Sequence, residues 1–423
     1  MKKTTPYISA LMDINKESIR NLAIEAALAP QEELRPVGHK HQRLTIGIPK
    51  ETSFQEKRVA LVPESVGLLV SHGHKVVVET GAGKEAHFED HDYSEAGAHI
   101  VYSPQDVFRS ELIMKVAPPS IEEIAMMPGK PAGSSGQTLI CAIHMPVQKA
   151  ETFKQLSAKK VTAIGWDYIK DDSGIYPVVR AMGEIAGNTS VLIAAEYLSN
   201  SSGGQGLMFG GISGVKPTEV VIIGAGTVGE FATRASLGLG ATVKVFDNNV
   251  YRLRRLQSDL GMRLWTSTIQ PTHLRNALET ADVAIGALHT KGGRTPIVVS
   301  EDMVSNMKYG SVIVDIDIDQ GGCFETCRVT THDKPIFKEH GVIHYCVPNL
   351  ASRVSRTASY ALSNIFAPIV LSIGDEGGIS NLVRNHHGFR HGVIMYNGVL
   401  TSEIIGTTFE LPWKSLDLLM AAF

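Results

Sequence analysis

The chain has 423 residues, of which 43% are hydrophobic and 20% are charged, and its formal net charge is −3. This length is more than one hydrophobic core comfortably holds, so we expect two domains. The balanced charge gives no general attraction to nucleic acid or to an anionic membrane, so no partner of either class is expected.

The first 43 residues are polar and mixed, and they predict an N-terminal extension. The opening Met1-Lys2-Lys3 is followed by residues that lack the apolar core of a signal peptide. No run of about 18 uninterrupted apolar residues is present, so no membrane span is expected. The four cysteines match no zinc or redox spacing and favour a reducing compartment, so the expected location is the cytoplasm.

Short apolar runs alternate with helical patterns from Leu44 onward. The runs of the first half are LTIGIPKE, KVVVE, HIVY, ELIMKV, TLICAI and VTAIG. A glycine- and serine-rich stretch at residues 200–217 separates them from a second series, EVVIIG, TVKVFD, DVAIGAL, SVIVDI and VIHYCV. A long helical pattern follows from Arg356. This alternation predicts an α/β fold with two doubly wound, mostly parallel sheets, joined near residues 178 and 355.

The strongest motif is G-x-G-x-x-G, formed by Gly224, Gly226 and Gly229 between an apolar strand and a helix. Glycines here permit a tight turn, close approach of the backbone to a pyrophosphate, and close packing of helix on strand. Asp247 follows the next strand, at the spacing of an acid that binds the adenosine ribose hydroxyls. Two asparagines come next rather than an arginine, which favours NAD over NADP. The competing interpretation is a structural turn followed by a surface aspartate.

Arg252 belongs to a short basic cluster with Arg254 and Arg255 that is typical of a solvated helix face. We place Arg252 among the cofactor-binding residues. The histidines within residues 385–391 have no acid or cysteine at ligand spacing, so they are interpreted as a solvated loop and no metal site is predicted.

A later strand, VIVDIDID, ends in three acids at alternate positions: Asp315, Asp317 and Asp319. All three would lie on one face if the strand continued through them. Doubly wound sheets bind ligands outside the carboxyl ends of their strands, and Asp319 falls just past such an end, where a nicotinamide ring could lie. Asp315 is deeper and is interpreted as a structural cap for a neighbouring loop, while Asp317 is left ambiguous.

Four segments extend the pattern beyond the glycine motif: GIPKETSFQEKRVALVP, GGISGVKPTEVVIIGAGTVG, VDIDIDQGGCFE and HYCVPNLASRVSRTASYAL. Together they resemble the alanine dehydrogenase family, which shares its fold with the soluble NAD-binding part of proton-translocating transhydrogenase. The resemblance covers about residues 44–412. It implies two Rossmann-like domains with a cleft between them, the first completed by returning C-terminal helices.

The domains implied by the resemblance are a substrate and catalytic domain and an NAD-binding domain. Residues 44–177 and 356–412 would form the first, residues 178–355 the second, and residues 413–423 a C-terminal tail. The implied reaction is the reversible oxidative deamination of L-alanine to pyruvate and ammonium with NAD. The family assembles as hexamers or smaller oligomers, so a homo-oligomer, with the hexamer favoured, is expected.

The resemblance also assigns roles by position. Arg58 matches the arginine that grips the substrate carboxylate, since a guanidinium offers two parallel charge-assisted hydrogen bonds. His144 matches the catalytic histidine that moves a proton to and from the carbinolamine. Asp319 matches the aspartate that stabilises developing positive charge on the amino group. The remaining matched positions are Asn349, on the nicotinamide side, and Ala287 and Leu288, beside the ribose.

The sequence departs from the family at two positions. The family carries a second substrate-binding lysine where this chain has Ala117, and a serine that contacts the cofactor phosphates where it has Gly183. Lys115 is expected to substitute as a substrate-binding residue, with a lysine that extends to solvent as the alternative. Arg180, three residues earlier, is expected to compensate by contacting either a cofactor phosphate or the substrate.

Two other functions compete with an NAD-dependent alanine dehydrogenase. The first is a transhydrogenase-like hydride-transfer component, although those relatives do not retain the residues that stand here as His144 and Asp319. The second is a non-catalytic NAD-binding regulator, which only Ala117 favours.

Overall fold

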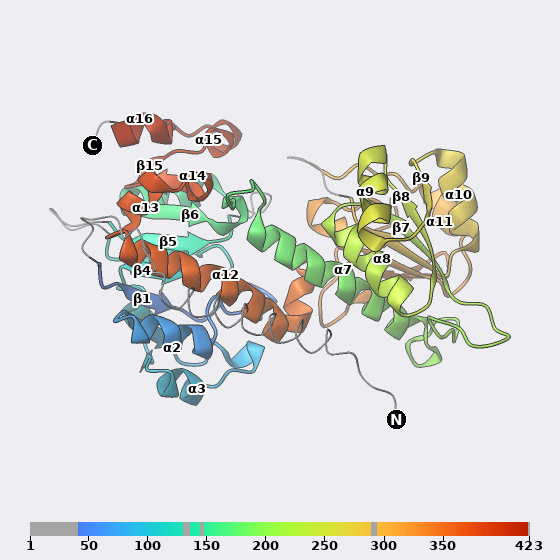
Figure 1. The fold of residues 1–423 in the computed structure, drawn as a ribbon, viewed down its shortest axis with the longest axis horizontal. Coiled ribbons are helices and arrows are strands. Elements are labelled where there is room, and N and C mark those ends of the chain that lie inside the picture. Colours follow the sequence, from blue (N-terminus) through green and yellow to red (C-terminus); the bar gives the residue numbers. More distant parts are fainter. Residues whose placement is uncertain (1–40, 130–135, 144–147, 289–293, 422–423) are drawn as a thin grey trace, which may run out of the picture. The chain divides into compact units, whose positions relative to one another are not determined.

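The computed structural model describes residues 41–129, 136–143, 148–288 and 294–421. In this part of the chain the strands form two separate sheets (Figure 1). The first, with eight strands, has the order β15-β14-β6-β5-β4-β1-β2-β3 and the second, with seven, has the order β12-β13-β11-β10-β7-β8-β9. The fold class predicted from the sequence, two doubly wound α/β units, is confirmed.

Most strands of the first sheet are parallel, from β3 through β6. Their bounds are β1 Thr45–Ile48, β2 Lys75–Glu79, β3 His99–Val101, β4 Leu112–Met114, β5 Thr138–Cys141, β6 Thr162–Gly165, β14 Val393–Tyr396 and β15 Val399–Leu400. Each of the first six lies inside one of the six predicted apolar runs. The central strands are buried on both faces, which is why their sequences are continuously apolar rather than alternating.

In the second sheet all strands are parallel except β12, which pairs antiparallel with β13 at the edge. Their bounds are β7 Glu219–Ile223, β8 Thr242–Phe246, β9 Trp265–Ser267, β10 Val283–Gly286, β11 Val312–Asp315, β12 Ile336–Glu339 and β13 Val342–Tyr345. The sequence patterns missed β9 and β12. Both are short edge strands without a continuous buried run.

Helices connect the strands, and many begin at a recognisable signal. Proline opens α2, α4, α7 and α10, where its missing N–H costs nothing, and Ser120 with Glu123 forms a capping box on α5. The helices of the first half are α2 Pro63–Ser71, α3 Asp90–Glu95, α4 Pro104–Val107, α5 Ile121–Met126, α6 Ala150–Ala158 and α7 Pro177–Leu198. Those of the second half are α8 Thr227–Gly238, α9 Val250–Leu260, α10 Pro271–Thr280, α11 Glu301–Ser305, α12 Ser355–Asp375, α13 Ile379–Asn385, α14 His387–Arg390, α15 Glu403–Phe409 and α16 Leu416–Ala421. Short 3₁₀ turns are η1 Lys84–Ala86, η3 Trp166–Tyr168, η4 Asn200–Ser202, η5 Ile316–Gln320 and η6 Leu350–Val354.

Both sheets have the same winding around a central pair of strands. The order β3-β2-β1-β4-β5-β6 and the order β9-β8-β7-β10-β11-β13 each reverse direction once, between β1 and β4 and between β7 and β10. Doubly wound sheets bind ligands at such reversal points, outside the carboxyl ends of the strands. We therefore expect the functional side chains in the loops that follow these four strands.

The C-terminal part of the chain returns to the first sheet and contributes strands as well as helices. β14 pairs antiparallel with β6, and β15 pairs antiparallel with β14, so they extend the sheet beyond β6. Only helices were predicted here, although VIMYNGVL holds both strands of a hairpin, with β14 and β15 joined at Asn397 and Gly398.

One helical stretch in the described residues, Leu350–Asp375, is long and apolar enough to cross a membrane by length and composition alone. Half of its apolar window is buried, and Leu362, Phe366 and Val370 belong to the core of the first sheet. Such burial is what the core helix of a water-soluble domain shows, so this stretch is weak evidence for a membrane span.

Candidate active site

The glycine motif forms a turn that other residues could not form. Gly224 has φ +116°, and a Cβ there would lie 2.1 Å from the carbonyl oxygen of Ala287. A Cβ on Gly229 would lie 1.8 Å from the carbonyl oxygen of Gly224. These two glycines therefore permit the turn and let α8 pack directly on the strand ends.

Gly226 is different, because a Cβ there would meet nothing within 4 Å. It is the N-cap of α8 and has no side chain to accept the first N–H groups of the helix. The helix N-terminus thus presents unpaired backbone donors and partial positive charge to open space, which is the arrangement that binds a phosphate.

Asp247 follows β8 and is almost fully buried. Its Oδ2 accepts from the backbone N–H of Ala225 at 2.8 Å, and its Oδ1 accepts from that of Asn249 at 2.7 Å. Each carboxylate oxygen keeps a second acceptor position, so the group can still accept a hydroxyl. The carboxylate ties the glycine turn to the start of α9 and faces the same opening.

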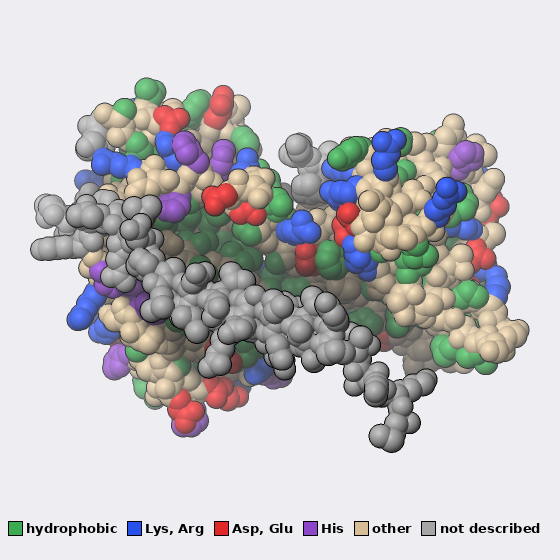
Figure 2. Space-filling model, viewed as in Figure 1, with side chains coloured by type: hydrophobic (Ala, Val, Ile, Leu, Met, Phe, Trp, Pro, Cys, Tyr) green, Lys and Arg blue, Asp and Glu red, His purple; other side chains and the backbone are tan. Residues whose placement is uncertain are grey.

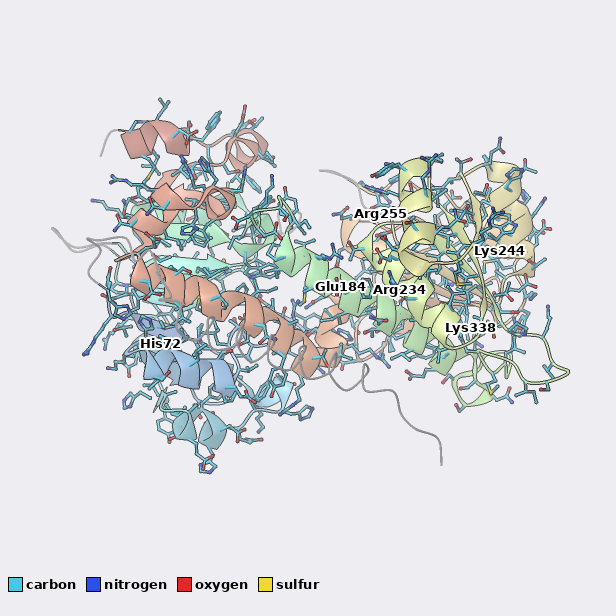
Figure 3. All side chains as sticks on the ribbon, viewed as in Figure 1. His72, Glu184, Arg234, Lys244, Arg255 and Lys338 are labelled. Carbon is cyan, nitrogen blue, oxygen red and sulfur yellow. The ribbon has the colours of Figure 1, made fainter. Side chains whose placement is uncertain are left out.

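Arg252 lies in the first turn of α9, with Nη1 3.7 Å from Asp247 Oδ2 and a side chain 42% exposed. Glu230 of α8 pairs with Arg255 of α9 and with Arg234, one turn along α8 itself; both arginines are labelled in Figure 3. In Figure 2 basic side chains are interleaved with acidic ones over this region, which agrees with the solvated helix face expected from the sequence.

Asp315, Asp317 and Asp319 do not share one strand face, because the strand does not continue through them. The strand ends at Asp315, and residues 316–320 form the 3₁₀ turn η5. Asp315 accepts from the backbone N–H groups of Asp317, Cys323 and Phe324, so its predicted role as a loop cap is confirmed. The turn forms because this carboxylate satisfies backbone donors that a continued strand would have paired with a neighbour.

Asp317 accepts a hydrogen bond from the backbone N–H of Leu288, in the loop that follows β10. Ala287, the residue before it, donates to the carbonyl of Ile223 at 2.8 Å, so this loop lies against the glycine turn. Burial, together with the negative charge of Asp315, raises the pKa of the Asp317 carboxyl to about 8. Asp315, Asp317 and Cys323 lie within 4.8 Å of one another, but both carboxylates already bond backbone N–H groups.

We expect Asp317→Asn to stabilise the protein at alkaline pH. A carboxyl whose pKa rises from 3.8 to about 8 on folding binds more protons when folded, so its contribution favours folding at low pH and is lost as the pH rises through about 8. Asparagine keeps an acceptor for Leu288 and removes the buried charge. The loss runs progressively from about pH 4 to about pH 8, so thermal unfolding between pH 5 and 9 should show a gain on the order of a few kcal/mol at the alkaline end and a clearly smaller gain at pH 5.

Asp172→Asn is the matched control, because Asp172 is exposed. Its stability profile should run parallel to that of the unaltered protein. An Asp317→Asn protein that lost stability equally at every pH would show that the carboxylate is needed as a charged acceptor for Leu288 instead.

At the reversal point of the first sheet, the loops after β1 and β4 meet through a buried ion cluster. Lys115 is fully buried, and its Nζ donates to Glu51 Oε2 at 2.9 Å and to Glu123 Oε1 at 3.0 Å. Glu51 Oε1 also accepts from the backbone N–H of Val116 at 2.6 Å. The alternative of a lysine extending to solvent is therefore wrong, and the Nζ lies between the carboxylates of Glu51 and Glu123. Burial would lower the pKa of Lys115, but the two carboxylates hold it above its ordinary value.

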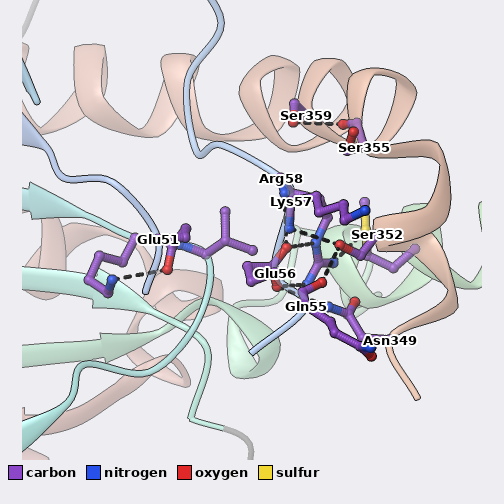
Figure 4. Close-up of polar contacts among 12 residues, drawn as sticks. Glu51, Gln55, Glu56, Lys57, Arg58, Asn349, Ser352, Ser355 and Ser359 are labelled. Atoms are coloured by element: carbon purple, nitrogen blue, oxygen red, sulfur yellow. Dashed lines mark hydrogen bonds and ion pairs between the residues drawn. The ribbon is translucent and has the colours of Figure 1, made fainter. Parts of the chain in front are cut away.

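Arg58 lies in the loop after β1, and its guanidinium is held by a neighbour in sequence (Figure 4). Its Nε donates to Glu56 Oε1 at 2.7 Å and its Nη2 to Glu56 Oε2 at 2.6 Å, while Nη1 contacts the sulfur of Met182 at 3.3 Å. Burial by itself would raise the pKa of the Glu56 carboxyl, but the charge and hydrogen bonds of Arg58 hold it below its ordinary value. The pair is fully charged at neutral pH.

Serine hydroxyls from the C-terminal part of the chain fix this loop. Backbone N–H groups at positions 57, 59 and 62 donate to Ser352, Ser359 and Ser363 at 2.9, 2.9 and 3.0 Å. Two of these serines lie in α12 and one in η6. Loop donors that could find no partner in a strand are thus satisfied, and the position of Arg58 depends on α12.

Asn349 connects the loop after β1 to Asp319 in η5. Its Nδ2 donates to Glu56 Oε2 at 3.0 Å, and its backbone N–H donates to Asp319 Oδ2 at 3.5 Å. The residue has φ +53°, a left-handed conformation that asparagine tolerates better than most residues. The structure therefore brings Arg58, Asn349 and Asp319 together, while His144 lies outside the described residues.

The remaining predicted positions are placed as follows. Arg180 pairs with Glu184 one turn along α7, with half of its side chain exposed. A Cβ at Gly183 would lie 3.4 Å from a methyl of Val228, so packing alone does not require glycine there. Neither observation places Arg180 at the phosphate-binding turn.

Sequence reasoning missed Glu51, Glu56 and Glu123. Glu56 stands two residues before Arg58, and that spacing was the available signal, because side chains at i and i+2 can share one face of an extended loop. Glu123 is on a helix and Glu51 in a loop, so nothing in the linear sequence relates either one to Lys115.

Comparison with known proteins agrees with this geometry. Residues 47–186 match the family described as alanine dehydrogenase/PNT, N-terminal domain, and residues 190–403 match the corresponding C-terminal domain. The alanine dehydrogenase of Mycolicibacterium smegmatis is 39% identical over 371 residues, which is 88% of this chain and 98% of that protein. The one from Bacillus subtilis is 39% identical over 363 residues, covering 86% and 94%.

Solved structures show the same likeness. An L-alanine dehydrogenase superposes with a TM-score of 0.80 at 37% identity, over 87% of this chain and 99% of that one. A transhydrogenase from Sinorhizobium meliloti has a TM-score of 0.71 at 24% identity, over 85% and 99%, and shares the fold. With both family domains matched in order over most of its length, the chain belongs to the alanine dehydrogenase/PNT family.

Proposed function

We propose that this protein is an NAD-dependent alanine dehydrogenase that catalyses the reversible oxidative deamination of L-alanine to pyruvate and ammonium. The observation that carries the proposal is the contact series from Arg58 through Glu56 and Asn349 to Asp319. Two residues, Glu56 and Asn349, thus link the proposed carboxylate-binding arginine to an acid that follows a strand of the proposed dinucleotide-binding sheet. The relatives named above, at 37–39% identity, carry the name of that activity.

The residues around the glycine motif fit NAD. The open N-terminus of α8 at Gly226 would hold the pyrophosphate, and Asp247 would accept the adenosine ribose hydroxyls. A buried carboxylate at that position repels a 2′-phosphate, which favours NAD over NADP. Ala287, Leu288 and Arg252 would contact the ribose region. When bound, NAD supplies the acceptor for the hydride that leaves the substrate Cα.

The chain's own residues bind and orient the substrate. Arg58 would bind the carboxylate, because a guanidinium already fixed by Glu56 loses little rotational freedom on binding. Asp319 would face the amino group and stabilise the positive charge that develops as the iminium forms. His144, by its position in the family pattern, would accept and return the proton of the carbinolamine.

Ala117 leaves the substrate site without the second lysine of the family. Lys115 remains the proposed substitute. Glu51 and Glu123 take two of its three Nζ donors, and because the side chain is fully buried, a direct contact with substrate requires the Nζ to move. The proposal also includes the domain division at residues 44–177 with 356–412 and 178–355, a cytoplasmic location, and assembly into a homo-oligomer, with a hexamer expected.

An assay of the purified full chain with NAD and L-alanine tests the activity. NADH should appear at alkaline pH, and pyruvate with ammonium should consume NADH. Hydride exchange between two nucleotides without alanine would instead support a transhydrogenase-like component. Tight NADH binding without either reaction would support the third alternative, a non-catalytic nucleotide-binding regulator. A panel of small amino acids and 2-oxo acids then determines whether alanine is preferred.

Gly226→Ala should weaken NADH binding without unfolding the protein. A Cβ at position 226 meets nothing within 4 Å of the protein, so it projects into the space proposed for the pyrophosphate. We expect a loss of roughly tenfold to a hundredfold in affinity, about 1.4–2.7 kcal/mol, measured by NADH fluorescence titration.

Gly238→Ala is the matched control, since a Cβ there also meets nothing within 4 Å and the residue closes the same helix. It should bind NADH normally and unfold at the same or a slightly higher temperature, because alanine favours helix more than glycine does. Equal NADH affinity in both variants would show that the pyrophosphate does not bind at the N-terminus of α8.

A further inference from the structure

Glu56 occupies a central position in the site, although neither the glycine motif nor the family pattern quoted above assigns it a role. It lies in the turn between Gln55, which has φ +61°, and Arg58, and its side chain is only 4% exposed. Figure 4 shows it between the guanidinium of Arg58 and the amide of Asn349. A buried carboxylate in this position requires partners for its charge, and the structure supplies them.

Four donors saturate the Glu56 carboxylate. Oε1 accepts from the backbone N–H of Arg58 at 3.0 Å and from its Nε at 2.7 Å. Oε2 accepts from Arg58 Nη2 at 2.6 Å and from Asn349 Nδ2 at 3.0 Å. A carboxylate has about four acceptor positions, so a substrate carboxylate could displace this one only by leaving a buried charge with fewer partners. Glu56 is therefore a fixed partner of Arg58 and does not merely occupy the position of the substrate carboxylate. We call this Glu56–Arg58 pair the brace.

The brace determines which donors remain for the substrate. A guanidinium has five N–H groups, and among the described residues Glu56 takes two and the sulfur of Met182 takes one. One N–H remains on each terminal nitrogen, the number that a bidentate carboxylate uses. Because the edge formed by Nε and Nη2 already binds Glu56, the substrate carboxylate can approach only the edge formed by Nη1 and Nη2.

The same carboxylate reaches the second sheet through Asn349. This residue follows β13, and its backbone N–H donates to Asp319 in the turn after β11. A change in the position of Asn349 therefore acts directly on Glu56, and a change at Asp319 acts on Glu56 through Asn349. Both reach Arg58 through Glu56. The contacts join the loop after β1 to the two loops that border the proposed nicotinamide position.

We propose that Glu56 is a positioning residue that orients Arg58 for the substrate carboxylate and couples substrate binding to dinucleotide binding through Asn349. This inference rests on the proposed function. Since coupling between two ligands is reciprocal, pyruvate should tighten NADH binding by the same factor by which NADH tightens pyruvate binding. Glu56 is expected to carry most of that factor.

Glu56→Gln tests the proposal. Glutamine has the same length but is neutral, and its amide nitrogen would face donors from Arg58 or Asn349. We expect KM for pyruvate and L-alanine to rise roughly tenfold to a hundredfold with kcat reduced less than threefold, and NADH alone to bind as before. NADH titrations with and without pyruvate, in the absence of ammonium so that no turnover occurs, should show the coupling factor fall to near one.

Two further variants test the link through Asn349 and control for the loss of a buried acid. Asn349→Gly retains the left-handed backbone and removes the Nδ2 donor, so it should abolish the coupling factor while raising KM less than Glu56→Gln does. Asp282→Asn is the matched control: this buried acid pairs with Lys308 at 2.6 Å and with a backbone N–H, on the second sheet away from Arg58. It should change stability and leave KM and the coupling factor unaltered.

The outcomes separate the inference from the function on which it rests. Normal KM values and normal coupling in both Glu56→Gln and Asn349→Gly, with an active unaltered protein, overturn the inference alone. If Glu56→Gln does not fold, the coupling factor of Asn349→Gly decides in the same way. If the unaltered protein neither oxidises L-alanine nor reduces pyruvate with ammonium, the proposed function fails and the inference fails with it.

Discussion

Arg58→Lys should lower kcat/KM for L-alanine and for pyruvate by roughly a thousandfold, about 4 kcal/mol. Lysine keeps the charge but has no planar fork, so it cannot hold Glu56 with two hydrogen bonds and still offer two donors to a substrate carboxylate. The Nζ is expected to settle on Glu56, the nearest carboxylate. Initial rates in both directions, with NADH affinity measured separately, show whether the loss falls on substrate rather than on the dinucleotide.

Arg234→Lys provides the comparison, because Arg234 also makes paired hydrogen bonds to one glutamate, Glu230, but lies on α8 and is 37% exposed. The same change there should alter kcat/KM less than twofold. Native-like rates in Arg58→Lys would show that the substrate carboxylate is bound elsewhere, and the proposed orientation of alanine in the site would then be wrong.

Much of the fold was predictable because the signals were local. Buried parallel strands are continuous apolar runs, and the six runs of the first half and five of the second each contain a strand. The strands that were missed, β9, β12, β14 and β15, are edge strands or antiparallel additions. β9 and β14 pair with the earlier strands β8 and β6, whereas β12 and β15 are short hairpin partners of β13 and β14, and a pattern of buried apolar runs reports neither kind of pairing.

The site was predictable where the local structure accepts only one type of residue. Gly224 and Gly229 have no room for a side chain, and Asp247 is buried where a ribose acid is expected. Prediction was weaker where several side chains share a charge. The sequence left open whether the strand continues through Asp315, Asp317 and Asp319, because it does not show that Asp315 bonds backbone N–H groups and ends the strand.

The two reversal points place different chemistry at equivalent positions. After β7 and β10 the chain has glycine, small residues and backbone donors, and it leaves an open helix N-terminus. After β1 and β4 it has Glu51 and Lys115, which form a buried ion pair. The second sheet thus presents backbone donors at its reversal point, whereas the first presents charged side chains that already bind one another, with Arg58 further along the loop after β1.

Lys115→Met should destabilise the protein by about 3–5 kcal/mol, since it leaves Glu51 and Glu123 buried without their shared cation. Methionine matches the length of the lysine stem, so packing changes little and the loss reports the charge. Burial already raises the pKa of Glu51, and without Lys115 that carboxyl would take up a proton more readily. Chemical denaturation at pH 8 and pH 5 should therefore show a larger loss at pH 8.

The double variant Lys115→Met/Glu51→Gln decides between a structural cluster and a substrate-binding lysine. Removing one of the two acids along with the cation leaves one buried negative charge in place of two, so more than half of the lost stability should return. Lys308→Met removes a lysine that is 31% exposed and pairs with a single acid, and it should cost less. If Lys115 Nζ leaves its glutamates for the substrate, the stability of the double variant recovers while KM for L-alanine stays at least tenfold high. If the cluster serves only to hold Val116 and Ala117 in place, KM recovers together with stability, and the site binds alanine without a lysine at this position.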